Sequence, residues 1–206
     1  MAGGKGERLG SGGVEKPLLE FRGRPLIEHV LAALNKSQIE RVVTVTSPRT
    51  PCTTRWAREA RIQAVKAPGQ GYIQDYSWAS KRLGLQGPVL IIAADLPLID
   101  YRLIDRVIER RAEAESSALG VYLPYEFCDE AEVPPDLIFA ADAKLLVPTG
   151  INIVDASHLD QLQQETMFVI RDESLLYNIN RRSDLKRLIQ RASAVTSESG
   201  NDVTKA

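Results

Sequence analysis

The chain has 206 residues, of which 44% are hydrophobic, so it can bury one substantial core. Its formal net charge is −1, and its basic and acidic residues are interspersed, which argues against a polyanion-binding surface and hence against a nucleic-acid partner. No apolar run approaches the roughly 18 residues needed to span a bilayer, and Cys52 and Cys128 lie far apart and outside any CxxC spacing. We therefore expect a cytoplasmic protein with no membrane partner and no structural zinc site.

The first stretch of the chain, AGGKGERLGSGGVEKPL, is rich in glycine and carries three basic residues. Glycines lack a Cβ, so this backbone can adopt positive φ and turn its N–H groups toward a bulky anion. The basic side chains add positive charge, and the arginine can form a planar fork on phosphate oxygens. The residues that we expect to bind phosphate here are Gly3, Gly4, Lys5, Gly6, Arg8 and Lys16.

Two familiar phosphate loops do not match this stretch. A Walker loop needs Gly-Lys followed by Ser or Thr, whereas Gly4-Lys5 is followed by Gly6. A dinucleotide fingerprint needs a third glycine at the position that Leu9 occupies. The remaining pattern, GGxGxRLG followed by Lys-Pro-Leu, resembles the signature of nucleotidyltransferases. The alternative is a flexible glycine-rich tail.

Helices and strands are predicted to alternate over the first half of the chain. The run from Pro25 places its apolar residues on one helical face, and RVVTVT and PVLIIAA are typical of strands. The predicted elements are helix 25–36, strand 41–46, helix 53–61, strand 63–67, a helix from a second glycine turn to about residue 83, strand 88–94 and helix 101–115.

Strands dominate the second half, in the runs SALGVYLP, DLIFA, INIVD and MFVI. The acidic segment 126–135 is expected to be a mobile loop, and a last helix is expected to start near residue 183. Residues 193–206 are small and polar, so we expect a nucleotidyltransferase domain over 1–192 followed by a disordered tail over 193–206.

This alternation indicates an α/β fold: a single Rossmann-like domain with a mostly parallel sheet and helices on both faces. The strand 88–94 agrees, because a parallel strand covered on both sides is apolar on both faces. Ligands bind beyond the carboxyl ends of such strands, so Asp95 should share a rim with the glycine loop. Thr46 and Ser47 are predicted on the same rim as nucleotide-contacting residues. In the second glycine turn, Gly71 is a further predicted binding residue and Asp75 is predicted to line the base pocket.

Asp95 is the predicted ligand of a divalent metal. A carboxylate at the end of a buried strand can hold Mg²⁺ through one or two oxygens, while phosphate and water complete the shell. The alternative is that Asp95 caps the turn before Pro97. Lys16 is predicted to reach the phosphates as a point charge rather than remain a solvated loop lysine. The candidate catalytic residues are Arg8, Lys16 and Asp95.

The nucleotidyltransferases that the glycine loop resembles join a nucleoside triphosphate to a phosphorylated acceptor and release pyrophosphate. Such a transfer needs little acid–base catalysis, because the attacking oxygen is already anionic. His29 and His158 are accordingly expected to pack or to lie on the surface. Asn152 is a candidate contact to the acceptor. Tyr72 either lines the base pocket or belongs to the core.

Taken together, these motifs resemble those of the archaeal adenosylcobinamide-phosphate guanylyltransferases. These enzymes belong to the nucleotidyltransferase superfamily that also includes molybdenum cofactor guanylyltransferase. The blocks that carry the resemblance, spread over residues 2 to about 190, are AGGKGERLG with VEKPL, TSPRTP, GQGYIQD, the strand ending at Asp95, INIV, and NIN before DL. The resemblance implies a nucleotide-diphospho-sugar transferase fold, Mg²⁺ as cofactor, and transfer of GMP from GTP to adenosylcobinamide phosphate with release of pyrophosphate. It implies Asn180 as a second metal ligand, although Asn180 could equally serve a turn, and a homodimer as a candidate assembly.

Three other functions stay open. In a molybdenum-cofactor nucleotidyltransferase the second glycine block carries a Gly-Pro-Leu-like run, where this chain has GQGYIQD. A sugar-phosphate nucleotidyltransferase usually has a longer acceptor domain. A non-catalytic nucleotide-binding regulator would keep the loop and lose the metal ligand, so Asp95 and Lys16 weigh against it.

The sheet is expected to lack its first strand. A parallel sheet of this kind places its glycine loop directly after a central strand, yet only Met1 precedes Ala2. In the family that the chain resembles, an apolar strand ending in Met leads into AGGKG. One hypothesis is therefore that Met1 is an internal residue taken for the start.

Overall fold

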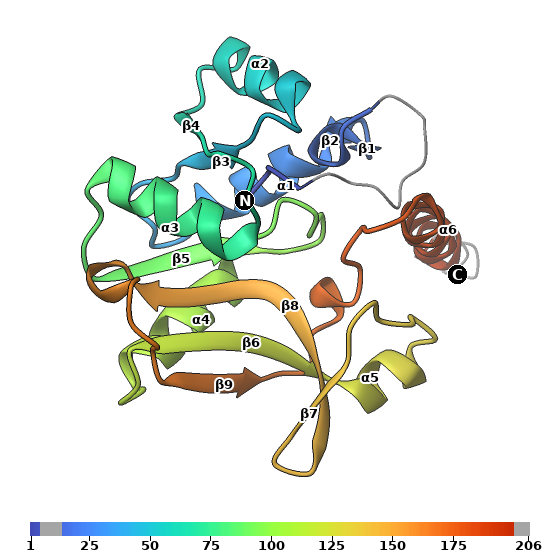
Figure 1. The fold of residues 1–206 in the computed structure, drawn as a ribbon. Coiled ribbons are helices and arrows are strands. Elements are labelled where there is room, and N and C mark those ends of the chain that lie inside the picture. The colour runs from blue at the N-terminus through green and yellow to red at the C-terminus, as the bar shows by residue number, and fades with distance from the viewer. Residues whose placement is uncertain (5–13, 200–206) are drawn as a thin grey trace.

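The computed structural model describes residues 1–4 and 14–199. It shows an α/β fold in which helices cover both faces of a central sheet, as predicted from the alternating pattern (Figure 1). The first half contains the short hairpin β1 (Glu20–Phe21) and β2 (Arg24–Pro25), then α1 (Leu26–Leu34), β3 (Thr44–Thr46), α2 (Pro51–Glu59), β4 (Ala64–Lys66), α3 (Tyr72–Leu83), β5 (Pro88–Ile92) and α4 (Tyr101–Ala112).

The second half supplies the rest of the sheet and the last helices. Its elements are β6 (Ala118–Pro124), α5 (Tyr125–Glu130), β7 (Phe139–Ala141), β8 (Lys144–Asp155), β9 (Glu165–Val169) and α6 (Arg182–Ser199). The predicted mobile loop at 126–135 is wrong in its first part, because α5 occupies it and buries Cys128. The backbone of 193–199 continues α6 instead of starting a disordered tail.

The main sheet has the order β5-β8-β6-β9, with β7 paired to β8. Strands β6 and β9 are parallel, whereas β8 runs antiparallel to β5, β6 and β7. The sheet is therefore mixed, with β8 running opposite to β5, β6, β7 and β9, and the predicted α/β fold with a mostly parallel sheet is confirmed. The reversal arises at the two-residue turn between β7 and β8, where Asp142 and Ala143 both have positive φ (48° and 59°), as a tight hairpin requires.

Met1 and Ala2 lie between the β3–β4 pair and β5 (Figure 1). The Met1 amine donates to Ile92 O at 2.6 Å, and Ala94 N donates to Met1 O at 3.0 Å, which is parallel pairing centred on residue 93. Ala2 N donates to Val45 O at 2.8 Å, so the two residues join both sheets. A cavity of about 660 Å³ that Met1 lines lies next to this pairing, and residues of β5 and Val45 of β3 also line it.

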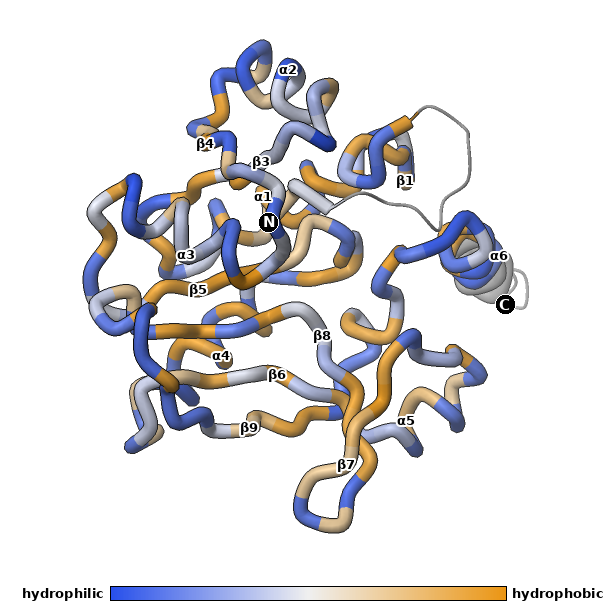
Figure 2. Tube along the Cα trace, viewed as in Figure 1, coloured by the Kyte–Doolittle hydropathy of each residue, from blue (hydrophilic) through white to orange (hydrophobic). Residues whose placement is uncertain are grey.

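The largest core cluster packs α1 and α4 against the sheet. Leu26, Leu103 and Leu119 in it are at most 2% exposed. Figure 2 shows β5 coloured as hydrophobic along almost its whole length, and its last two residues, Ile91 and Ile92, are buried. Asp95 follows just beyond this end of the strand. No helix in the described part of the chain is long and apolar enough to cross a membrane.

Candidate active site

Three side chains from distant parts of the chain meet beyond the end of β5. Lys16 begins the 3-10 helix Lys16–Leu18, Asp95 follows β5, and Asn180 precedes α6. Lys16 Nζ donates a 2.6 Å hydrogen bond to Asn180 Oδ1 and forms an ion pair with the Asp95 carboxylate. The side chains of Lys16 and Asp95 are 15% and 13% exposed, so water screens this pair only weakly. The structure thus brings together the three residues expected to contact phosphate and metal.

Backbone contacts fix the segment that carries Asn180. Ile179 N donates to Asp95 O at 3.0 Å, which ties the segment to the end of β5. The Asp184 carboxylate, in the first turn of α6, accepts hydrogen bonds from Asn180 N (2.9 Å) and Arg181 N (2.7 Å). A carboxylate is favoured at a helix N-terminus by the unpaired N–H groups and by the helix dipole. The position of the Asn180 amide is thereby set from two sides.

Glu15 fixes the backbone next to Lys16. Its carboxylate accepts hydrogen bonds from Cys52 N (2.6 Å), Thr53 N (2.7 Å) and Thr53 Oγ1 (2.6 Å) at the N-terminus of α2. These bonds anchor the described chain that follows the glycine loop to a separate helix. Sequence reasoning missed this role, because the partners lie more than 35 residues away and only the position of Glu15 beside Lys16 hinted at it.

The donors in this cluster fit a magnesium ion. Asp95 Oδ1 is buried and has no hydrogen-bond partner among the described residues, and Asn180 contributes an amide oxygen. The Lys16 ammonium contacts the Asp95 carboxylate and the Asn180 amide oxygen, so the space between these two oxygen donors suits a cation. No group of three or more His, Cys, Asp or Glu side chains in the described residues could hold a metal. A Mg²⁺ ion here would take two protein oxygens at Asp95 and Asn180 and the rest of its shell from phosphate and water, as Mg²⁺ commonly does.

A cavity of about 180 Å³ opens on this cluster, and we call it the first cavity. It is bounded by the two glycine turns and by two cations, Lys16 and Arg49, of which Arg49 was not anticipated from the sequence. The predicted residues that line it are Gly3, Gly4, Lys16, Gly71, Asp75 and Asp95. Lys5, Gly6 and Arg8 lie outside the described residues, so their predicted phosphate contacts stay predictions.

Thr46 and Ser47 lie behind the first cavity instead of facing it. Both are 0% exposed, and neither lines the cavity. Ser47 Oγ donates to Gly3 O at 2.7 Å, and a Cβ added at Gly3 would lie 3.1 Å from Ser47 Cβ. In the structure, therefore, these residues support the backbone of the glycine loop, which corrects the direct nucleotide contact expected of them.

The second glycine turn is shaped by Asp75. Gly69 and Gly71 have φ of +81° and +136°, values that residues with a Cβ rarely adopt. Asp75 Oδ1 accepts hydrogen bonds from Gly69 N (2.8 Å) and Gln70 N (3.0 Å), and Asp75 is 5% exposed. Asp75 thus holds the turn in place at the start of α3, and Gly71 brings its backbone to the cavity wall.

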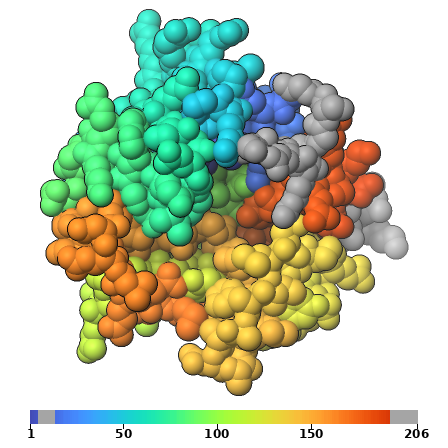
Figure 3. All heavy atoms as spheres, in the orientation of Figure 1, coloured from blue at the N-terminus to red at the C-terminus, as the bar shows by residue number. Residues whose placement is uncertain are grey.

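A second cavity, of about 410 Å³, lies next to the first and shares Tyr72 and Ala93 with it. In Figure 3 the surface is hollowed where α3, β8 and the chain around residues 131–138 meet. Asn152 Nδ2 donates to the Tyr72 hydroxyl at 3.3 Å. Burial raises the pKa of Tyr72 to about 12, although the hydrogen bond from Asn152 opposes the rise. Tyr72 therefore stays protonated at neutral pH, and its hydroxyl can donate a hydrogen bond.

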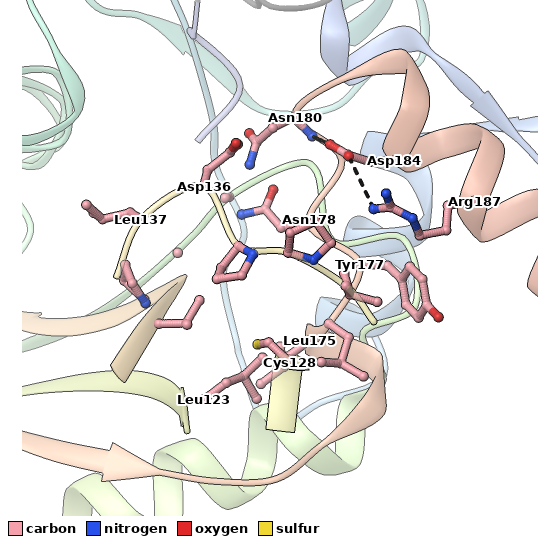
Figure 4. A pocket seen from close by; sticks show the side chains of 18 of the residues that line it. Leu123, Cys128, Asp136, Leu137, Leu175, Tyr177, Asn178, Asn180, Asp184 and Arg187 are labelled. Carbon is pink, nitrogen blue, oxygen red and sulfur yellow. Dashed lines mark hydrogen bonds and ion pairs between the residues drawn. The ribbon is translucent and has the colours of Figure 1, made fainter. Parts of the chain in front are cut away.

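The second cavity has a polar mouth and an apolar floor (Figure 4). The polar groups at its mouth are those of Asp136, Asn178, Asn180, Asp184 and Arg187. The floor includes Leu123, Leu175 and Cys128. Burial raises the pKa of the Cys128 thiol to about 11, so this cysteine is a protonated, apolar part of the floor and not a nucleophile.

Comparisons with known proteins identify the family. Residues 1–195 match the model of the MobA-like NTP transferase domain. The chain belongs to this family. An adenosylcobinamide-phosphate guanylyltransferase from Methanocaldococcus jannaschii is 34% identical over 197 residues, which cover 90% of this chain and 92% of that protein. As a MobA-like protein the chain is a nucleotidyltransferase, and the predicted family resemblance is confirmed.

One further relative and one solved structure are also similar to the chain, and the solved structure bears on the fold alone. A probable molybdenum cofactor guanylyltransferase from Thermococcus sibiricus is 25% identical over 91% of this chain and 94% of that protein. A solved structure described as a hypothetical transferase from Thermus thermophilus has a TM-score of 0.66 at 17% identity, covering 90% of this chain and 96% of that one. That likeness supports the fold of the MobA-like domain.

Proposed function

We propose that this nucleotidyltransferase transfers GMP from GTP to adenosylcobinamide phosphate, with Mg²⁺, and releases pyrophosphate. The observation that carries the proposal is the contact of Lys16 with Asp95 and Asn180 at the boundary of the two cavities, because a transfer enzyme must hold a donor and an acceptor on either side of one charged centre. The acceptor is taken from the guanylyltransferase of Methanocaldococcus jannaschii, which is 34% identical over 90% of this chain.

The reaction is a displacement at phosphorus. An acceptor phosphate oxygen forms a bond to the α-phosphorus of GTP, the bond from that phosphorus to the β-phosphate oxygen breaks, and pyrophosphate leaves with the electron pair. The attacking oxygen is anionic at neutral pH, so no general base is needed. The task of the chain is to align the two phosphates and to neutralise their charge.

The residues of the first cavity suit the donor side. The Gly3 and Gly4 backbone can approach the phosphates closely, and Lys16 and Arg49 supply positive charge to the departing pyrophosphate. Asp95 and Asn180 would hold Mg²⁺, which when bound neutralises phosphate charge as a Lewis acid. Asp75 and Gly71 form the wall at the start of α3, where the nucleoside would lie.

A molybdenum-cofactor substrate is the second candidate. The relative from Thermococcus sibiricus covers 91% of this chain, at the lower identity of 25%. Both acceptors end in a phosphate monoester, so the same cluster would serve either one. A non-catalytic regulator is disfavoured, because the charged centre keeps its lysine and its acidic ligand together.

The test is to incubate the purified chain with GTP and MgCl₂ and with either adenosylcobinamide phosphate or molybdopterin. Pyrophosphate release and the mass of the product are measured in both reactions. We expect pyrophosphate and adenosylcobinamide-GDP in the first. A guanylylated pterin with no corrinoid product would show that the acceptor is wrong, and GTP binding without product in either reaction would favour the regulator. The variant Asp95→Asn serves as the low-activity control.

A further inference from the structure

The two cavities adjoin at the charged centre. Lys16 and Asp95 line the first cavity, and Asn180, which Lys16 contacts, lines the second. In a displacement at phosphorus the attacking and leaving oxygens are roughly in line. If pyrophosphate departs toward Gly3 and Gly4, the acceptor has to approach from the side of the second cavity.

Arg187 is a cation at the mouth of the second cavity (Figure 4). It lies on α6, and its side chain is 39% exposed. Among the described residues its guanidinium makes one long ion pair, 3.9 Å from Nη1 to Asp184 Oδ1. The other Asp184 oxygen is occupied by Asn180 N and Arg181 N. A guanidinium carries five N–H donors, so Arg187 retains the capacity to bind a planar face of phosphate oxygens.

The remaining charges at this mouth are already paired. Asp136, on the chain between α5 and β7, accepts a 2.8 Å bond from Arg181, and Asp184 neutralises the N-terminus of α6. An incoming phosphate therefore meets carboxylates that have partners. The 3.9 Å ion pair of Arg187 with Asp184 is longer than the 2.8 Å contact of Arg181 with Asp136. Arg187 is therefore the cation at this mouth that can most readily leave its carboxylate partner and bind a phosphate.

We propose that the second cavity binds the phosphate-bearing arm of the acceptor and that Arg187 binds its phosphate monoester; this inference rests on the proposed function. Leu123, Leu175 and the protonated Cys128 make the floor apolar, so the arm next to the phosphate is short and aliphatic. A volume of about 410 Å³ is that of a small-ligand site, so the bulk of a large acceptor stays outside.

The matched pair of variants is Arg187→Ala and Arg191→Ala. Arg191 lies one turn further along α6, pairs with Glu173 at 3.4 Å and lies over the Tyr177 ring, outside the cavity. Loss of a charge-assisted contact predicts that Arg187→Ala raises the KM for the acceptor about 10–100-fold. The KM for GTP should stay within about twofold, and Arg187→Lys should recover part of the loss. Arg191→Ala should leave both constants unchanged.

A second measurement does not need turnover. With the first cavity filled by an α,β-methylene analogue of GTP and Mg²⁺, inorganic phosphate is titrated into each protein by calorimetry. Phosphate should bind the native chain and Arg191→Ala alike and bind Arg187→Ala at least about tenfold more weakly. A purely structural role of Arg187 would lower thermal stability without this selective loss.

The outcomes separate the two proposals. If product forms and Arg187→Ala leaves the acceptor KM and phosphate binding unchanged, the inference is wrong and the proposed function stands. If phosphate binding depends on Arg187 and neither candidate acceptor yields product, the anion site stands and the proposed function is wrong. Equal loss for GTP and acceptor would also overturn the inference, because it would place Arg187 in the general support of the site.

Discussion

Removal of the Lys16 ammonium is the sharpest perturbation that the site offers. In Lys16→Ala the Asn180 amide oxygen loses its 2.6 Å donor and the Asp95 carboxylate loses its ion-pair partner. Asp95 Oδ1 already has no partner among the described residues, so the variant leaves this carboxylate with neither oxygen paired there. Both turnover and stability should therefore respond.

The size of each effect follows from the burial of the pair. A positioned charge that acts on the transition state typically contributes about 10²–10³ in rate, or ~2.7–4 kcal/mol, so turnover should fall by that factor. Breaking a buried ion pair costs roughly 3–5 kcal/mol, and the pair here keeps some contact with water, at 15% and 13% exposure. We therefore expect the free energy of unfolding to fall by about 1–3 kcal/mol, a loss that a folded domain can survive.

The assay measures pyrophosphate release at saturating GTP, Mg²⁺ and acceptor, with urea unfolding of the same samples. Lys36→Ala is the matched control, because Lys36 is an exposed lysine at the end of α1 and away from both cavities. The reasoning is refuted if Lys16→Ala, shown to be folded by circular dichroism, keeps turnover within about threefold of the native chain, since the expected loss is at least about 10².

Three further predictions test the ligands, the anchor and the buried terminus. Asp95→Asn should lower turnover by about 10²–10³ and weaken Mn²⁺ binding in the GTP complex, measured by electron paramagnetic resonance; unchanged Mn²⁺ affinity would remove Asp95 from the metal site. Glu15→Ala should lower the free energy of unfolding by about 1–2 kcal/mol in urea titrations and should also lower kcat. Glu15→Gln keeps an amide oxygen that accepts hydrogen bonds, so its losses in stability and in kcat should be smaller. Equal losses in the two variants would contradict the anchoring role. Burial lowers the pKa of the Met1 amine from 8.0 to about 6, with the Asp95 charge opposing the shift. Between these two pH values the unfolded chain binds a proton that the folded chain does not. The free energy of unfolding should therefore rise from pH 6 to pH 8 by up to about 3 kcal/mol. Acetylation of the Met1 amine, on protein whose intact mass shows this residue, should remove this contribution to the pH dependence of the free energy of unfolding.

The alternating elements and the rim of the sheet could be predicted, because both depend on patterns local in the sequence. The run that becomes β5 is readable as a short, continuous apolar segment, and the run that becomes α1 is readable from its period of 3.6 residues. The rule that ligands bind at strand ends then places Asp95 near the glycine loop without any knowledge of contacts. The same rule does not say which side chains at a strand end face the ligand, so the inward burial of Thr46 and Ser47 could not be predicted.

The reversed strand β8 and helix α5 depend on information that the sequence pattern does not carry. The hairpin before β8 turns at Asp142-Ala143, and alanine is not a residue that signals positive φ. Helix α5 lies in an acidic segment, and it buries Cys128 in the core, with Tyr125 and Phe127 packed against the same cluster, which is a long-range contact. In both places tertiary packing overrides the local preference.

Each side chain of the charged centre depends on a second residue that fixes its backbone from a different part of the fold. Glu15 anchors the chain beside Lys16 to α2, and Asp184 holds Asn180 at the start of α6. The bond from Ile179 N to Asp95 O then joins the segment that carries Asn180 directly to the end of β5. Lys16 closes the arrangement by contacting both oxygen donors, so a shift of any one segment changes the distance between the two donors that would hold the metal. The accuracy of the site therefore depends on acidic residues that touch no substrate, which is why a sequence motif can locate this centre and still not define its geometry.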